Sequence, residues 1–211
     1  MYLGPEIGSS VINGFDVQKN VLGRLLAAED AAAYEASIGG TCGRALVLLR
    51  PLSRGSININ ATAPTGDPVV DFRTFTNPLD VEQAVAFVQY TRQWMNTPTL
   101  AQLGPIEITP GANVTDYAGL VKHVRATSFP TSFHPSGTAA MMPRDLGGVV
   151  GSDLKVYGVE GLSIVDASII PLIPASHLSA TVYAVAEKVR RTVCYILSIL
   201  KNLTNLITLG L

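Results

Sequence analysis

The feature that most constrains this 211-residue chain is a loop shaped by two prolines that leads directly into an amphipathic helix. Pro171 and Pro174 fix their own backbone angle and bias the preceding residues away from helical conformation. From Ser179 onward, apolar residues recur at three- and four-residue spacing, which predicts a helix with Ser179 as its N-cap. His177 is therefore expected beside the positive end of a helix, a position that suits an electron-rich ligand group.

Two strand-like runs and a second histidine precede this loop. Residues 155–157 and 162–165 are rich in β-branched and apolar side chains, and glycines bracket the turn between them. His134 stands directly before a Pro-Ser-Gly-Thr sequence. Histidine is well suited to move a proton near neutral pH, and small or rigid neighbours let a ligand come close. His134 and His177 are candidate acid–base residues, and a hydrogen-bonded structural role for each is the alternative.

Several motifs in this order resemble the C-terminal signature of the glucose-methanol-choline (GMC) family of FAD-dependent alcohol oxidoreductases. The resemblance covers residues 44–193, and the Met-Met-Pro sequence at 141–143 together with a histidine at 177 is similar to the fungal branch. That branch contains glucose oxidases, glucose dehydrogenases and aryl-alcohol oxidases. The matching motifs are Pro51-Leu52-Ser53-Arg54-Gly55-Ser56, His134-Pro135-Ser136-Gly137-Thr138, Gly147-Gly148-Val149-Val150, Val156-Tyr157-Gly158-Val159, Val165-Asp166-Ala167-Ser168 and Ala186-Glu187-Lys188.

The resemblance implies a chemical role for the two histidines. His134 would be the general base that takes the hydroxyl proton of an alcohol, and His177 would hydrogen-bond the same oxygen. The carbon-bound hydrogen would leave as hydride to the flavin, so that the protein handles the proton and the cofactor acts as electron sink. The implied substrate is a primary alcohol or a sugar.

The resemblance also implies which residues contact the cofactor, FAD. Asp166 and Ala167 match positions that contact the ribityl-phosphate part of FAD, and Leu178 and Ser179 match positions under the flavin pyrimidine. The positive helix end expected near Ser179 would favour negative charge on reduced flavin.

The implied fold is α+β: a GMC substrate-binding domain with an antiparallel sheet and helices on one face, plus a strand-loop-helix that returns to the FAD domain. Residues 1–43 would lead into the substrate domain, residues 44–193 would form the GMC C-terminal region, and residues 194–211 a divergent apolar tail. The G-x-G-x-x-G motif that holds the FAD pyrophosphate is absent from the sequence. We therefore expect the last part of an enzyme, without its N-terminal Rossmann-type FAD domain. A non-catalytic fragment that binds no flavin by itself is the alternative.

The first part of the chain predicts one helix and two strands. Residues 17–37 form an amphipathic pattern that two glycines, Gly39 and Gly40, would end. Residues 44–50 and 56–61 are strand candidates, and we expect them to pair antiparallel. Residues 64–68 are expected to form a turn.

Two further helices have clear start signals. Asn77 is followed by a proline and, at the third position, by Asp80, which is typical of a helix N-terminus. A second helix is expected to start at Asp116, and its His123 lies away from the apolar stripe. We interpret His123 as a solvated residue without a chemical role.

Two other chemistries can be drawn from the same residues. Ser136, Asp166 and His177 stand in the order of a hydrolase triad, but the G-x-S-x-G elbow that exposes such a serine is absent. A zinc site would need His123, His134 and His177, among which no two are closely spaced. Both are weaker hypotheses than the oxidoreductase.

Composition limits the partners. A net charge of -1 and the absence of a basic run argue against nucleic acid and an anionic membrane surface. The apolar run in the tail is too short and too interrupted for a confident membrane span. Three N-glycosylation sequons start at Asn60, Asn113 and Asn202. Since roughly one is expected by chance, they only point toward a secreted parent enzyme, and the localisation stays open.

Overall fold

The computed structural model of the chain describes residues 7–36 and 46–191. The described residues combine helices with small antiparallel sheets, which agrees with the expected α+β class. One more helix covers residues 179–191, up to the limit of the described part. In chain order the other elements are α1 (Ser9–Leu26), β1 (Tyr34–Ala36), β2 (Leu46–Leu48), β3 (Ser56–Asn58), β4 (Val69–Asp71), α2 (Pro78–Met95), α3 (Pro98–Ala101), α4 (Tyr117–Thr127) and the 3-10 helices η1 (Arg144–Leu146) and η2 (Ala167–Ile169).

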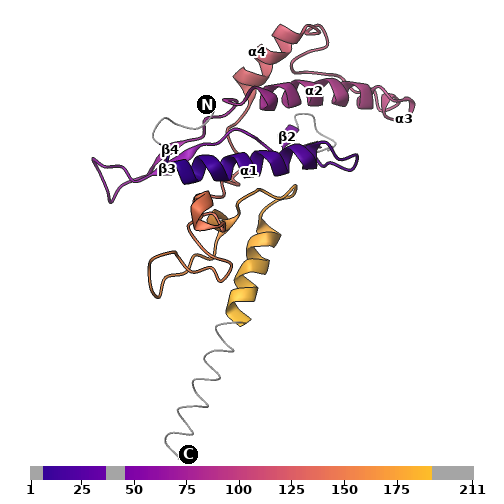
Figure 1. Cartoon of the computed structure of the whole chain (residues 1–211). Helices are drawn as coiled ribbons and strands as arrows, with labels where there is room; N and C mark the ends of the chain where they lie inside the picture. Colours follow the sequence, from indigo (N-terminus) through magenta and orange to yellow (C-terminus); the bar gives the residue numbers. More distant parts are fainter. Residues whose placement is uncertain (1–6, 37–45, 192–211) are drawn as a thin grey trace, which may run out of the picture.

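Helix α1 lies between two parts of the molecule (Figure 1). Helices α2 and α4 lie on one side of it, and the C-terminal segment, coloured orange to yellow, lies on the other. Neighbouring residues of α1 contact the segment between β2 and β3 and the 3-10 helix η1. The guanidinium carbon of Arg54 lies 5.6 Å from the centroid of the Phe15 ring. A Cβ atom at Gly14 would overlap the carbonyl oxygen of Leu146 in η1, so only glycine permits this close approach.

The helix predicted over residues 17–37 is wrong in its bounds. Helix α1 starts at Ser9 and ends at Leu26, and residues 34–36 form strand β1 instead. Strand β1 pairs with β2, and the Tyr34 ring stacks on Phe87 of α2 with the centroids 4.2 Å apart. These long-range contacts override the helix propensity of the alanine-rich stretch. The predicted stop at residues 39–40 lies outside the described residues.

The predicted pairing of the two strand candidates is also wrong. Strand β2 pairs antiparallel with β1, whereas β3 pairs antiparallel with β4, which the sequence did not predict. The described residues therefore hold two separate two-stranded sheets in place of the single sheet expected. The turn predicted at residues 64–68 lies in the connection between β3 and β4, and it closes that hairpin.

A buried carboxylate explains why β2 and β3 do not pair with each other. Asp80, in the first turn of α2, is 1% exposed and accepts hydrogen bonds from the backbone N–H groups of Leu52 (2.8 Å) and Ser53 (2.7 Å). These bonds hold the segment between β2 and β3 against the start of α2. Burial lowers the pKa of Arg54, which follows in the same segment, and the charge of Asp80 opposes this shift.

The two helices with clear start signals are confirmed. The Asn77 side chain accepts from the backbone N–H of Leu79 at the start of α2, and the Asp116 side chain accepts from the N–H of Gly119 at the start of α4. The two helices bury one shared apolar cluster. Its buried members are Val81, Val85, Leu120 and Val124.

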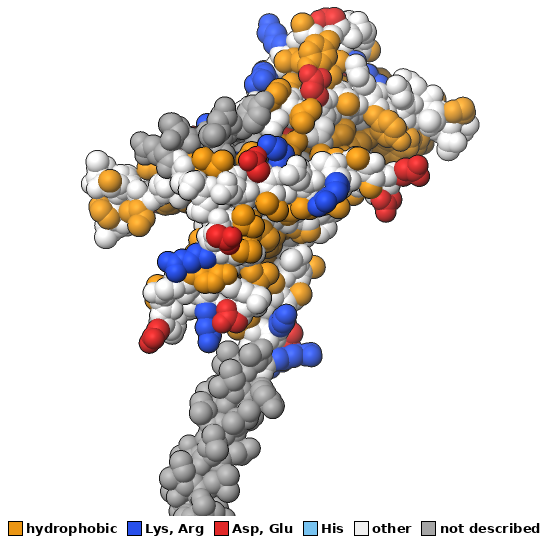
Figure 2. All heavy atoms as spheres, viewed as in Figure 1, with side chains coloured by type: hydrophobic (Ala, Val, Ile, Leu, Met, Phe, Trp, Pro, Cys, Tyr) orange, Lys and Arg blue, Asp and Glu red, His pale blue; other side chains and the backbone are white. Residues whose placement is uncertain are grey.

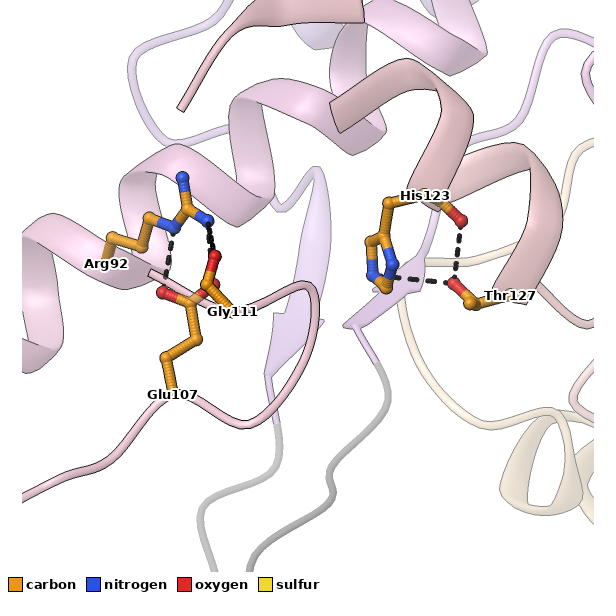
Figure 3. Close-up of polar contacts among 5 residues, drawn as sticks. All are labelled: Arg92, Glu107, Gly111, His123 and Thr127. Carbon is orange, nitrogen blue, oxygen red and sulfur yellow. Dashed lines mark hydrogen bonds and ion pairs between the residues drawn. The ribbon is translucent and has the colours of Figure 1, made fainter. Parts of the chain in front are cut away.

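Figure 3 shows polar contacts around these helices. Arg92 of α2 forms a bidentate ion pair with Glu107, at 2.9 and 2.7 Å, and also donates to the carbonyl oxygen of Gly111. These bonds tie the connection between α3 and α4 to α2. On α4, the Thr127 hydroxyl donates to the backbone carbonyl of His123 and lies 3.5 Å from its ring Nε2.

In the C-terminal segment the predicted strands form only isolated bridges. Lys155 pairs antiparallel with Ser163, supported by a backbone hydrogen bond from Val156 to Leu162 at 3.0 Å. The predicted helix is present from residue 179, but its first backbone hydrogen bond runs from Val182 to the carbonyl of Leu178. The cap position therefore falls on Leu178, one residue earlier than predicted.

The expected division of the chain stays a prediction. Both boundaries, at 43/44 and 193/194, and the apolar tail over residues 194–211 lie outside the described residues. Within the ranges that the structure does describe, no helix has both the length and the apolar character needed to cross a bilayer.

Candidate active site

The two candidate histidines are in direct contact, although they lie far apart in the sequence. Nε2 of His134 lies 2.8 Å from Nδ1 of His177, and the rings are nearly perpendicular, at 81°. For this contact to be a hydrogen bond, one nitrogen must carry a hydrogen and the other must present a lone pair. The pair can therefore share a proton while it is neutral or carries one positive charge, but a doubly charged pair would lose the bond.

The second ring nitrogen of His177 faces a carboxylate. Nε2 of His177 lies 3.4 Å from Oε1 of Glu35 in β1, and the two side chains are 60% and 37% exposed. Side chains alternate along a strand, so Tyr34 stacks on α2 while Glu35 points to the opposite side. Glu35, His177 and His134 thus form a continuous row of polar groups.

The loop that carries His134 is held by its own backbone. The N–H of His134 donates to the Thr131 hydroxyl oxygen at 3.2 Å, and Phe133, directly before His134, has a φ of 62°. Downstream, Ala139 donates to the carbonyl of Ser168 at 2.9 Å. At Gly137 the φ is 85° and a Cβ would lie 3.0 Å from the carbonyl oxygen of Ile170, so glycine suits this position.

One side chain of α1 ties together the two loops of the site. The amide nitrogen of Gln18 donates to the carbonyl oxygen of Pro171 at 3.0 Å and to the sulfur of Met142 at 3.1 Å. Pro171 lies in the loop that leads to His177, and Met142 follows the loop that carries His134. Helix α1 therefore acts as a support for both histidines.

His134 also borders an open groove of about 400 Å³. The groove lies between the His134 loop, η2 and the first turns of the C-terminal helix, and its walls are mainly apolar. Leu178 is buried in its wall, whereas Tyr183 and Phe133 are strongly exposed. The lining residues are Phe133, His134, Pro135, Ala167, Leu178, Ser179, Val182, Tyr183 and Ala186.

The structure therefore brings most of the predicted site residues together. Three of the four predicted cofactor contacts, Ala167, Leu178 and Ser179, line the groove beside His134. The fourth, Asp166, is exposed and accepts from the backbone N–H of Ser168 at 2.8 Å, which starts η2. Its side chain thus shapes the turn that places Ala167.

The alternative chemistries find less support in these contacts. One ring nitrogen of His177 faces His134 and the other faces Glu35, while the Asp166 carboxylate accepts from the backbone of its own turn. His177 and Asp166 are therefore not paired as a hydrolase triad would require. Among the residues that can be described, no group of three histidine, cysteine or acidic side chains is placed to hold a metal ion.

Sequence reasoning missed two residues of the site, Glu35 and Gln18. Glu35 lies 142 positions from His177, within a stretch predicted as helix, and nothing in its neighbours indicates a strand. Gln18 occupies an ordinary polar position of an amphipathic helix. Only the tertiary fold brings either side chain to the site.

The fold defines a class of protein known from solved structures. The chain superimposes on a fungal aryl-alcohol oxidase with a TM-score of 0.83 and 42% sequence identity, over 89% of this chain and 32% of that one. An FAD-dependent oxidoreductase from Chaetomium thermophilum gives a TM-score of 0.84 and 36% identity over the same shares. The fold is thus that of part of a flavin-dependent oxidoreductase.

The sequence comparisons specify the family. A sequence model of the GMC oxidoreductase family matches residues 51–186. The protein "Dehydrogenase xptC" of Emericella nidulans is 34% identical over 183 residues, which cover 87% of this chain and 29% of that protein. Patulin synthase of Penicillium expansum is 42% identical over 148 residues, 69% of this chain and 23% of the enzyme. The chain belongs to the GMC oxidoreductase family.

These findings confirm the expected family and its cofactor. The solved relatives include an enzyme named as FAD-dependent and a formate oxidase described for its FAD modification, so FAD is the cofactor that the family indicates. The chain spans less than a third of the length of the relatives described above.

Proposed function

We propose that the chain is the C-terminal part of an FAD-dependent oxidoreductase that oxidises a primary alcohol or a sugar hydroxyl, with His134 and His177 as its acid–base pair. The single observation that carries this proposal is the 2.8 Å contact between the two histidines, one of which borders an apolar groove. Membership of the GMC family supports the reaction class.

The groove fits a flavin in its chemistry. Its walls combine apolar side chains with small residues, Ala167 and Ser179 among them, which let a flat ring come close to the backbone. The C-terminal helix starts at the same place, and its first N–H groups favour negative charge. Ala167, Leu178 and Ser179 would hold the group. Bound FAD supplies an acceptor for a hydride.

The histidines would divide the work on the substrate oxygen. His134, at the border of the groove, would accept the hydroxyl proton of the alcohol as the carbon–hydrogen bond breaks. His177 would hydrogen-bond the same oxygen through Nδ1, so the oxygen would take the place of the direct contact with His134, while Nε2 stays on Glu35. The oxygen would then lie between the two rings, and both could share the positive charge that the proton brings. Glu35 would orient the His177 ring.

The second candidate function is a non-catalytic chain that keeps the fold and binds no flavin by itself. Solvent exposure of the histidine pair favours this second candidate for the chain alone. The His177 side chain is 60% exposed, and water would reach the reacting atoms. The two candidates are compatible if the chemistry belongs to a longer protein.

A visible absorption spectrum tests whether the chain completes a flavin site unaided. The purified 211-residue chain is incubated with FAD, desalted and scanned, with an unrelated protein of similar size as control. We expect no stoichiometric flavin band, because the groove is open and the chain has no G-x-G-x-x-G motif. A retained band together with alcohol turnover would show that the chain completes the site unaided and would contradict the proposal of a partial enzyme.

A further inference from the structure

The hairpin of β3 and β4 carries a sequence motif that the proposed function does not use. It projects from the body of the molecule at the left of Figure 1, and Figure 2 shows hydrophobic side chains exposed on it. Every residue from 61 to 72 is exposed. Asn60-Ala61-Thr62, one of the three sequons, lies where the chain leaves β3.

The sequon at Asn60 is folded into a compact turn of its own. The side-chain carbonyl oxygen of Asn60 accepts the backbone N–H of Thr62 at 3.1 Å and the Thr62 hydroxyl at 2.8 Å. Both bonds use the oxygen and leave the amide nitrogen for other contacts. These two bonds lie within the sequon itself, so opening the turn breaks no contact with the body of the molecule among those described.

The sequon at Asn113 has a different environment. Its middle residue, Val114, packs against the α2–α4 apolar cluster. Just before it, the carbonyl of Gly111 accepts from Arg92, so this segment is fixed to α2. An enzyme that reads all three residues of a sequon needs a segment that can leave the surface. The bonds described for the Asn60 turn lie within its own sequon, whereas the Asn113 segment is anchored to α2, although Asn113 itself is exposed and Asn60 is half-buried. The third sequon, at Asn202, lies outside the described residues.

We propose that Asn60 is an acceptor for N-linked glycosylation and that it is modified in preference to Asn113. The donor is a lipid-linked oligosaccharide diphosphate. A bond forms between the Asn60 amide nitrogen and the anomeric carbon of the first sugar, while the bond from that carbon to the diphosphate oxygen breaks. The amide gives up one proton to a base of the transferring enzyme, and the lipid diphosphate leaves with the electron pair. No oxidant or reductant is needed.

The fold gives this modification a physical consequence. A two-stranded hairpin is an unprotected sheet, and this one exposes Ile57, Ile59, Val69 and Val70 by between 43% and 77%. A glycan on the adjoining turn covers part of this apolar surface and hinders pairing of the strand edges with another chain.

The test uses purified oligosaccharyltransferase and a lipid-linked oligosaccharide. The 211-residue chain is presented once folded and once denatured, and the occupancy of the peptides that contain Asn60 and Asn113 is measured by mass spectrometry. We expect the folded chain to be modified at Asn60 at several times the occupancy of Asn113, and the difference to shrink in the denatured chain. An unmodified Asn60 in the folded chain, or equal occupancy of the two sites, would overturn the proposal.

Two variants of one exposed residue give a matched comparison. Thr62→Ala removes the hydroxyl that both the turn and the sequon need, and it should abolish modification at Asn60 while Asn113 stays as it was. Thr62→Ser keeps a hydroxyl and should retain modification. Continued modification of Asn60 in Thr62→Ala would likewise contradict the assignment.

Discussion

At the scale of single residues, the proposed chemistry involves three side chains from three separate segments. His134 and His177 could be predicted from the sequence because each belongs to a local motif: one precedes Pro-Ser-Gly-Thr and the other ends a proline-shaped loop. Their contact could not be predicted from spacing, since it depends on how both loops dock on η2 and α1. Glu35 has no local motif, and only strand pairing of β1 with β2 turns it toward His177.

The position of Glu35 predicts the effect of its removal. Glu35→Ala frees one side of the His177 ring, and a ring that is no longer oriented should slow flavin reduction by the alcohol tenfold to a hundredfold, on the order expected for a small misplacement. The rate is measured by stopped-flow absorbance in an FAD-loaded protein that carries this chain.

Conservative and matched variants separate orientation from folding. Glu35→Gln keeps an acceptor oxygen and should recover most of the rate, whereas Glu29→Ala removes an exposed carboxylate of the same region and should leave it unchanged. Equal rates in Glu35→Ala and Glu29→Ala would mean that Glu35 does not orient His177.

At the scale of elements, prediction succeeded where the start of an element is coded locally. Asn77 and Asp116 cap α2 and α4 with their own side chains, so residues close in sequence contain the signal. Helix α1 has no side-chain cap at Gly8, and two glycines, Gly14 and Gly23, stand within it, so the local sequence does not indicate its start. The strand pairs depend on partners that are distant in the sequence. The alanine-rich residues before β1 have a high helix propensity, so their sequence predicts a helix.

Helix α1 supports the site through its close contact with η1, which predicts opposite effects of two glycine substitutions. Gly14→Ala places a Cβ against the carbonyl of Leu146 and should lower the free energy of unfolding by about 1–3 kcal/mol. Gly23→Ala, in the same helix with nothing within 4 Å, should raise it by about 0.5–1 kcal/mol. Urea denaturation measures both, and the same sign for both variants would contradict this packing.

The C-terminal helix predicts a dependence of stability on pH. The Glu187 carboxylate accepts from Arg190 and Arg191, and these bonds lower its pKa from 4.5 to about 2. Because the pKa is lower in the folded chain, the carboxylate stabilises it above pH 4.5, and this contribution is lost as the pH falls toward 2.

Glu187→Gln should therefore be less stable than the parent chain at neutral pH, and the difference should shrink between pH 4.5 and 2. The stabilisation by the Glu187 carboxylate is expected to be small, since this side chain is on the surface. Thermal unfolding followed by circular dichroism at several pH values measures it, with Glu160→Gln as control for loss of a surface charge. A difference that is constant with pH would rule out these bonds as its cause.

At the scale of the whole molecule, the fold is the part of a GMC oxidoreductase that carries the histidine pair and leaves the groove beside His134 open. The family could be recognised from the sequence because its motifs are local and follow a fixed order. The two small sheets and the support by α1 could not, because they arise from contacts among distant segments.

The proposed role of His134 is tested most directly by the anaerobic reduction of flavin by an alcohol. The measurement compares His134→Ala with His123→Ala in an FAD-loaded protein that carries this chain, since His123 contacts only its own helix in the bonds described. Loss of the base should slow reduction by a factor on the order of a hundred or more in His134→Ala, while His123→Ala reduces at the parent rate. An unchanged rate in His134→Ala, with FAD fully bound, would remove His134 from the mechanism.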